Sequence, residues 1–165
     1  MTDIPADALV ETWESIHKMS LDLAAKIEKH IHSTGEKFDA MIVVPRGSYY
    51  PANIVSRRLG FSANGLLHAC LESYEQQGTK RLTDFKLGQM PTKAELAGKK
   101  LLIIEEVCDT GRTLSFLVKR FKSQGAVLIR SGALHYKPGL SQTGFVPDWF
   151  VIETDKWIVY PWELL

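Results

Sequence analysis

The chain has 165 residues, of which 45% are hydrophobic and 24% charged, and its formal net charge is +1. This length suits one domain with a sizeable core, and the near-zero charge provides no global basic field of the kind that would suggest nonspecific nucleic-acid binding. No apolar run approaches the ~20 residues of a membrane-spanning helix, and the beginning "MTDIPADALVETWE" lacks the apolar core of a signal peptide. Two cysteines are too few for a disulfide scaffold. We therefore expect a cytoplasmic enzyme or binding domain with no nucleic-acid or membrane partner.

Helical and strand patterns alternate along the chain. Apolar residues recur at helical spacing from Leu9 to Ile31, and Gly35 is a plausible stop. The later elements, in chain order, are a buried strand at 40–45, a helix at 51–59 with Gly60 after its end, a strand at 65–74, a strand at 101–106, a helix at 113–125, a strand at 126–136, and one or two strands within 149–154 and 157–161. Because several strands are continuous aliphatic runs, the pattern predicts one α/β domain over 1–165, with a largely parallel central sheet flanked by helices.

A long polar stretch separates the strand at 65–74 from the strand that begins at Leu101. It has weak periodicity and three glycines, "EQQGTKRLTDFKLGQMPTKAELAGKK". A connection of this length in a compact domain is usually functional or mobile, so residues 75–98 are candidates for a loop that takes part in the activity.

The strand Leu101–Ile104 runs directly into two acids, Glu105 and Glu106, and the turn 109–113 then leads into a helix. Ligands of open α/β sheets bind beyond the carboxyl ends of strands. The helix N-terminus offers N–H groups to a phosphate, and Gly111 allows a close approach. The glutamates suit sugar hydroxyls or Mg²⁺ instead. A ligand with both a phosphate and a polyhydroxylated, metal-bound part would fit this pattern.

This stretch resembles the ribosyl-phosphate motif of type I phosphoribosyltransferases: an apolar strand, two acids, two residues and then Asp-Thr-Gly-x-Thr. The family usually has Asp at the second acidic position, so Glu106 is a departure that moves the carboxylate outward by one methylene. The resemblance implies that Asp109 is the base that takes a proton from the purine. It also implies that 5-phosphoribosyl diphosphate is bound by the whole motif, Glu105, Glu106, Asp109, Thr110, Gly111, Arg112 and Thr113.

A second segment, "VVPRGSYYPANIVSRRLG", is similar to the pyrophosphate loop of bacterial xanthine-guanine and hypoxanthine phosphoribosyltransferases. That loop has a basic residue followed by two glycines, and often a cis peptide before the basic residue. The similarity implies pyrophosphate binding by Arg46, Gly47 and Ser48. Ser48 replaces the second glycine, and its N–H and hydroxyl remain possible donors to a phosphate.

Two C-terminal segments, "HYKPG" and "DKWIVYPWE", resemble the base-recognition elements of the same enzymes. Lys137 would donate to the oxygen at C6 of the purine, which favours a 6-oxopurine over adenine. Trp157 would stack on the base, Ile158 would offer main-chain groups to its 2-position side, and Glu163 would lie near the base or a metal. Trp162 is expected to be structural.

Together with "TWESIH" near the N-terminus, these similarities cover nearly the whole chain. They imply a flexible catalytic loop within 75–98, next to Tyr74, in which Lys80 or Arg81 reaches the pyrophosphate, and a small base-recognition hood at 134–165. The implied cofactor is Mg²⁺, with Glu105, Glu106 and Glu163 as candidate ligands.

The implied activity is purine salvage: transfer of the 5-phosphoribosyl group from its diphosphate to guanine, xanthine or hypoxanthine, which the sequence does not distinguish. The family usually forms dimers or tetramers, and Tyr49 and Tyr50 would suit either an interface or a shielded core. An alternative is a weakly active or inactive sensor of the diphosphate or a nucleotide, and the departures Glu106 and Ser48 keep it open. Lys137 and Trp157 speak against other bases. A dinucleotide-dependent oxidoreductase lacks support, because no G-x-G-x-x-G follows the first strand.

Overall fold

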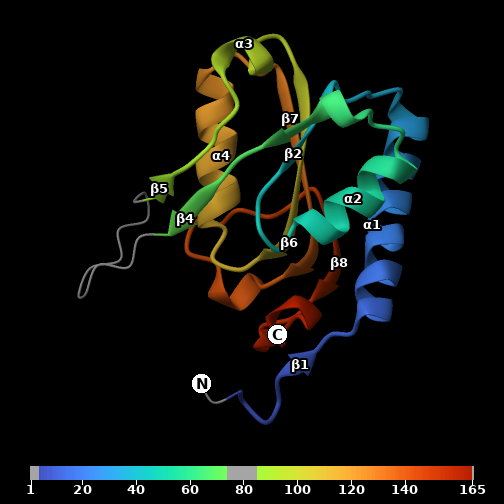
Figure 1. The fold of residues 1–165 in the computed structure, drawn as a ribbon, viewed down its shortest axis with the longest axis vertical. Helices are drawn as coiled ribbons and strands as arrows, with labels where there is room; N and C mark the ends of the chain where they lie inside the picture. The colour runs from blue at the N-terminus through green and yellow to red at the C-terminus, as the bar shows by residue number, and fades with distance from the viewer. Residues whose placement is uncertain (1–3, 74–84, 165) are drawn as a thin grey trace.

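The protein is built around a sheet of five parallel strands in the order β3-β2-β6-β7-β8 (Figure 1). The structure is a computed structural model that describes residues 4–73 and 85–164. The strands of this sheet are β2 Ala40–Val43, β3 Leu66–His68, β6 Lys100–Cys108, β7 Leu128–Tyr136 and β8 Trp149–Glu153. The predicted α/β fold with a largely parallel central sheet is confirmed.

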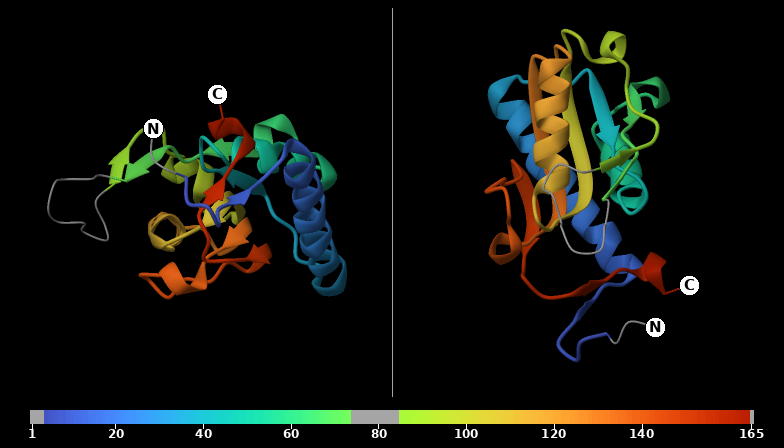
Figure 2. Two further views of the ribbon diagram at one scale, coloured as in Figure 1. Left: turned by 90° about the horizontal axis from the view of Figure 1, so that it is seen from below. Right: turned by 90° about the vertical axis from the view of Figure 1, so that its left-hand side faces the viewer.

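Helices cover both faces of this sheet (Figures 1 and 2). On one face lie α1, Trp13–Thr34, and α2, Tyr49–Arg58. On the other lie α4, Arg112–Ser123, and the short α3, Lys93–Leu96. The ends of α2 and α4 differ from the predicted bounds by one or two residues, a difference usual for helix termini.

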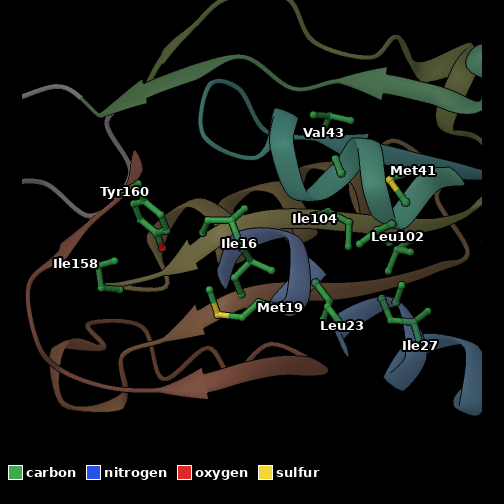
Figure 3. Close-up of a cluster of buried hydrophobic side chains, with 14 residues drawn as sticks. Ile16, Met19, Leu23, Ile27, Met41, Val43, Leu102, Ile104, Ile158 and Tyr160 are labelled. Carbon is green, nitrogen blue, oxygen red and sulfur yellow. The ribbon is translucent and has the colours of Figure 1, made fainter. Parts of the chain in front are cut away.

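Alternation along β2 and β6 divides the core into two clusters. Alternate residues of these strands face α1 and α2, namely Met41, Val43, Leu102 and Ile104. Their neighbours face α4, namely Ala40, Ile42, Leu101 and Ile103. Both sides are buried, which explains why these strands read as continuous aliphatic runs. In the first cluster, Figure 3 shows Ile158 and Tyr160 of the C-terminal segment at the end far from Ile27.

The N-terminal helix begins later than its apolar pattern predicted. Thr12 is the N-cap of α1 and forms a capping box with Ser15, while Gly35 ends the helix at a φ of 71°. The prediction that Leu9 belongs to this helix is therefore wrong. Leu9–Val10 instead form β1, which pairs in parallel with β9, Ile158–Val159.

The predicted single strand at 65–74 is also wrong, because the chain changes partner at Cys70. The Ala69 N–H still bonds the Val43 carbonyl of the central sheet, whereas the Cys70 N–H bonds Gln89. Two strands result: β3, and β4 at Leu71–Ser73, which pairs antiparallel with β5 at Phe85–Leu87.

The polar stretch at 75–98 is described only in its second half, which holds β5 and α3. Residues 74–84, and with them the predicted roles of Tyr74, Lys80 and Arg81, lie outside the described residues. The predicted hood at 134–165 includes the end of β7 and all of β8, which belong to the central sheet. Its other elements are η2 Pro138–Leu140, β9 and η3 Pro161–Glu163, and η1 Ala63–Gly65 precedes β3. Within the described ranges, no helix is long and apolar enough to cross a membrane.

Candidate active site

Two partly shielded carboxylates stand near the carboxyl end of β6. Burial, reinforced by the charges of Glu106 and Asp109, raises the pKa of Glu105 well above its usual range. Burial and the charge of Glu163 raise the pKa of Glu106 to about 7, although a bond from its own backbone N–H opposes the shift. This concentration of negative charge favours a ligand that brings a cation or several hydrogen-bond donors.

The acids were also expected to hold Mg²⁺ together with Glu163. Among the described residues, no group of three or more His, Cys, Asp or Glu is placed to hold a metal ion. Glu163 instead accepts a hydrogen bond from the Tyr160 N–H at 3.1 Å. Mg²⁺ typically takes one or two protein carboxylates and completes its shell with water and substrate phosphates. The pair Glu105 and Glu106 fits that requirement without Glu163.

The turn before α4 presents backbone N–H groups at the same end of the sheet. Gly111 occupies its N-cap position with a φ of 74°, and the first turn of α4 carries no acidic residue and no side-chain cap. One N–H, that of Arg112, has a long 3.4 Å bond to Oγ1 of Thr110. With the partial positive charge of a helix N-terminus, this turn suits a phosphate.

Arg112 joins the turn through its backbone, while its side chain is directed elsewhere. The residue is 9% exposed, and its guanidinium lies 5.5 Å from the ring centroid of Phe85 on β5. The expected contribution of Arg112 to phosphate binding is therefore available from its N–H group. Thr113, the next residue, is partly exposed in the first turn of α4.

A segment that carried no recognisable signal in the sequence packs against this turn. The Gln142 N–H bonds the Thr110 carbonyl at 2.9 Å. A Cβ atom on Gly111 would lie 2.5 Å from Oγ1 of Thr143 and 3.1 Å from Cβ of Phe145. Gly111 is thus required both by its positive φ and by this close approach.

Asp109, which directly follows β6, has a carboxylate oxygen that is shielded from solvent. Its Oδ1 atom is buried and has no hydrogen-bond partner among the described residues. A buried carboxylate oxygen without a donor is costly, so such atoms often mark functional positions. A ligand N–H at this point would satisfy it.

The pyrophosphate-loop segment lies between β2 and α2. The peptide bond between Pro45 and Arg46 is cis, as the resemblance predicted, and Arg46 is exposed. Ser48 departs from expectation: it is fully buried, and its hydroxyl donates to the Val44 carbonyl. The predicted donation from the Ser48 hydroxyl to a phosphate is therefore wrong for this arrangement, because the side chain points into the protein.

Glu106 reaches this loop from β6. A Cβ atom added to Gly47 would lie 2.5 Å from the carboxylate carbon of Glu106 and 3.0 Å from its Cγ. Gly47 does not have a positive φ, so the close contact, and not the backbone conformation, requires glycine here. The structure thus brings together the predicted ribose and pyrophosphate residues.

Of the predicted base-binding residues, Lys137 follows β7, Trp157 precedes β9 and Ile158 begins β9. Lys137 is 6% exposed, and its N–H bonds the Cys108 carbonyl at 3.0 Å, next to Asp109. Trp157 is 57% exposed, whereas Ile158 is 7% exposed. The carbonyls of Trp157 and Val159 accept bonds from β1 and Glu11. Because peptide groups alternate along a strand, those of Ile158 point away from β1.

Trp162 has the structural role that was expected. Its ring stacks between Tyr160 and Tyr50 with centroid distances of 4.6 Å to each, and Trp13 lies 6.0 Å away. The cluster ties the C-terminal η3 to α1 and α2.

Comparisons with known proteins agree with this geometry. Residues 12–164 match the family model described as the phosphoribosyl transferase domain. A xanthine-guanine phosphoribosyltransferase of Idiomarina loihiensis is 28% identical over 155 residues, which cover 93% of this chain and 85% of the relative. A purine phosphoribosyltransferase structure from Pyrococcus horikoshii superposes with a TM-score of 0.76 at 30% identity, covering 95% of each chain.

A further solved structure is a hypothetical protein of Neisseria gonorrhoeae with bound ppGpp. It has a TM-score of 0.77 and 26% identity, and the match covers 96% of this chain and 92% of that one. Because the family model spans nearly the entire sequence, and because its motifs meet at one edge of the sheet, the chain belongs to the phosphoribosyl transferase domain family.

Proposed function

We propose that this protein transfers the 5-phosphoribosyl group from 5-phosphoribosyl diphosphate to a 6-oxopurine, giving a nucleoside monophosphate and pyrophosphate. The purine class is supported by the names of the Idiomarina and Pyrococcus relatives. The observation that carries the proposal is the buried Oδ1 of Asp109, which has no hydrogen-bond partner among the described residues and stands beside the backbone turn at the start of α4. That arrangement suits a ligand with a 5′-phosphate and, nearby, a ring N–H to be deprotonated.

In the proposed reaction, a bond forms between C1 of the ribose and a nitrogen of the purine imidazole ring while the bond from C1 to the diphosphate oxygen breaks. Asp109 accepts the proton that the purine nitrogen loses. Arg46 and the N–H of Gly47 bind the departing diphosphate. The carboxylates of Glu105 and Glu106 accept hydrogen bonds from the ribose hydroxyls and favour the positive charge that develops on the sugar.

Mg²⁺, when bound, would supply charge neutralisation for the diphosphate. Glu105 and Glu106 would hold it, with phosphate and hydroxyl oxygens of the substrate as further ligands. The chemistry of these two donors fits the ion. Burial is the main cause that raises the pKa of both carboxyls, and a bound cation would oppose that shift.

Base selection would fall to the C-terminal segment. The Lys137 ammonium is a pure donor and suits the oxygen at C6, whereas the amino group of adenine is itself a donor. The exposed ring of Trp157 would stack on the purine. The Ile158 peptide groups, which point away from β1, would meet the 2-position side of the base. The choice among guanine, xanthine and hypoxanthine depends on these main-chain groups.

The test is to incubate the protein with 5-phosphoribosyl diphosphate, Mg²⁺ and guanine and to identify the products by chromatography. We expect guanosine monophosphate and pyrophosphate in equal amounts. The absence of nucleotide with guanine, and then also with xanthine and hypoxanthine, while the protein is folded and the diphosphate bound, would overturn the proposal.

A second candidate is a sensor that binds the diphosphate or a guanine nucleotide with little turnover. It is supported by the Neisseria gonorrhoeae structure with bound ppGpp and by the unusual Glu106. Calorimetric titration with ppGpp separates the two functions: tight binding of ppGpp without turnover of any base favours the sensor.

We also propose that the protein forms a homo-oligomer. Tyr49, which is 48% exposed, is a candidate contact between subunits. Sedimentation velocity tests this proposal.

A further inference from the structure

A chain of buried polar side chains links the N-terminal segment to the backbone of Glu106. Oε1 of Glu11 lies 3.0 Å from Nε2 of His135, and Nδ1 of His135 lies 3.0 Å from the hydroxyl oxygen of Tyr160. That hydroxyl donates to the carbonyl of Glu106 at 3.2 Å. Glu11, His135 and Tyr160 are 6%, 0% and 4% exposed, so water cannot readily replace these bonds.

The number of available protons decides which group donates and which accepts in each of these hydrogen bonds. A tyrosine hydroxyl has one proton, which here goes to the Glu106 carbonyl, so the phenol oxygen accepts from Nδ1 of His135. Nε2 of His135 and Glu11 then share one further proton, either as imidazolium and carboxylate or as imidazole and carboxylic acid. A glutamine at position 11 would also satisfy Nε2, because its amide can donate to a neutral ring. An alanine would not.

The same residues hold the segment that is proposed to bind the base. The Leu9 N–H bonds the Trp157 carbonyl at 2.8 Å, and the Glu11 N–H bonds the Val159 carbonyl at 2.9 Å. Tyr160 follows β9 directly, so its hydroxyl is the point at which this segment is tied to β6. Glu106, at the other end of that bond, has its carboxylate against Gly47 of the pyrophosphate loop.

Glu11, His135 and Tyr160 thus form a hydrogen-bonded bridge between β9 and β6, and the two strands differ in how firmly they are held. β6 lies inside the sheet and is paired with both β2 and β7. β9 has two residues and pairs with β1, itself a two-residue strand. Loss of the Tyr160 bond would therefore release the base side of the site and leave the side that binds the ribose and diphosphate in place.

We propose that Glu11, His135 and Tyr160 are positioning residues that hold the segment 157–159 at a fixed distance from Glu106. The bridge would thereby align the purine nitrogen with C1 of the ribose. None of the three touches substrate; they act through Glu106 and Trp157. This inference rests on the proposed function and adds an assignment for buried groups that the reaction itself does not use.

Tyr160→Phe tests the bridge with little change in packing, because phenylalanine keeps the ring that stacks on Trp162. Removal of the hydroxyl leaves the Glu106 carbonyl without this donor, and we expect about a tenfold loss in kcat/KM for guanine. KM for 5-phosphoribosyl diphosphate should change by less than about twofold, because β6 stays in place. The matched control is Tyr136→Phe, at a buried tyrosine on β7 that packs on Phe150.

Glu11→Gln and Glu11→Ala provide an independent pair, with thermal unfolding measured for each. We expect Glu11→Gln to retain most activity and Glu11→Ala to resemble Tyr160→Phe. Three results would each overturn the proposal. They are an equal loss in kcat/KM for guanine and for 5-phosphoribosyl diphosphate, no loss of activity in Tyr160→Phe, and equal activity in the two Glu11 variants.

Calorimetric affinities for guanosine monophosphate and for 5-phosphoribosyl diphosphate separate this test from that of the proposed function. Absence of turnover in the unmodified protein would defeat the proposed reaction alone. The bridge would still be supported if Tyr160→Phe weakened nucleotide binding and spared the diphosphate, and it would be overturned if both affinities stayed unchanged.

Discussion

The carboxylate of Glu106 lies directly against Gly47, so that a single methyl group on Gly47 would come within 2.5 Å of the carboxylate carbon. The two residues belong to different motifs, one proposed to bind the ribose and the other the pyrophosphate. The unusual length of the Glu106 side chain is therefore accommodated by a glycine in the neighbouring loop. This contact couples the two halves of the site that 5-phosphoribosyl diphosphate would span.

Gly47→Ala should lower kcat/KM about tenfold, because the methyl group forces the Glu106 carboxylate or the loop to move. In this background, Glu106→Asp should restore most of the loss, since the shorter side chain withdraws from the methyl group. Steady-state kinetics of both single variants and the double variant form a double-mutant cycle. Simple additivity of the two changes would show that the residues are not coupled.

Asp109→Asn should reduce kcat by about 10²- to 10⁴-fold, the usual contribution of a general base, because the amide cannot take the purine proton. Binding of 5-phosphoribosyl diphosphate, measured by calorimetry, should remain within about twofold, since the backbone N–H groups of the turn are unchanged. Asp22→Asn, in an exposed pair with Lys18 on α1, is the control. Turnover of Asp109→Asn close to that of the unmodified protein would rule out the base role.

Lys137→Ala should raise KM for guanine about tenfold or more, the cost of losing one hydrogen bond from a charged donor. KM for the diphosphate should be little affected. Lys122→Ala, at an exposed position near the end of α4, tests for a general effect of charge. An unchanged KM for guanine in Lys137→Ala would contradict its assignment to the base.

The folding stability should depend on Glu36, which links α1 to the sheet. Burial alone would raise the pKa of Glu36, but hydrogen bonds from Arg130 and His30 outweigh that effect and lower its pKa below 4.5. A carboxyl with a depressed pKa stabilises the fold above its unfolded pKa, and this contribution disappears as the pH falls through the folded value. Its partner Arg130 also bonds Asp148 at 3.0 Å.

Glu36→Gln should therefore reduce the free energy of unfolding by about 1 kcal/mol at neutral pH. The difference should shrink as the pH falls below 4.5, the unperturbed value for this carboxyl. Urea denaturation across this range checks the prediction, with Glu14→Gln at an exposed position of α1 as the control. A loss in the free energy of unfolding that stays constant with pH would contradict the assigned role of Glu36.

The parts of the site that the sequence predicted are those encoded by short, contiguous patterns. The run from Leu101 to Ile104 identifies a strand buried on both faces, and Asp109 to Thr113 then follows at a fixed spacing. Since strand and turn are consecutive, their relative position is largely local. The end of α1 and both ends of α4 were likewise close to prediction, because the apolar stripes of these helices face a continuous core.

The remaining features depend on contacts between distant parts of the chain. β1 and β9 have two residues each, too few to show a period, and they join opposite ends of the sequence. The contact of Glu106 with Gly47 and the inward turn of the Ser48 hydroxyl are decided by packing after the sheet has formed. No spacing rule places Glu11 beside His135. The helix α1 and three strands of the central sheet, β2, β3 and β6, separate Glu11 from β7, the strand that contains His135.

The most direct test of the account is nucleotide formation from 5-phosphoribosyl diphosphate and Mg²⁺ with guanine, xanthine, hypoxanthine and adenine in separate reactions. We predict transfer to at least one of the three 6-oxopurines and at most trace transfer to adenine, because Lys137 can only donate to the 6-position. No nucleotide from any of the four bases, or equal rates with adenine, would contradict the account.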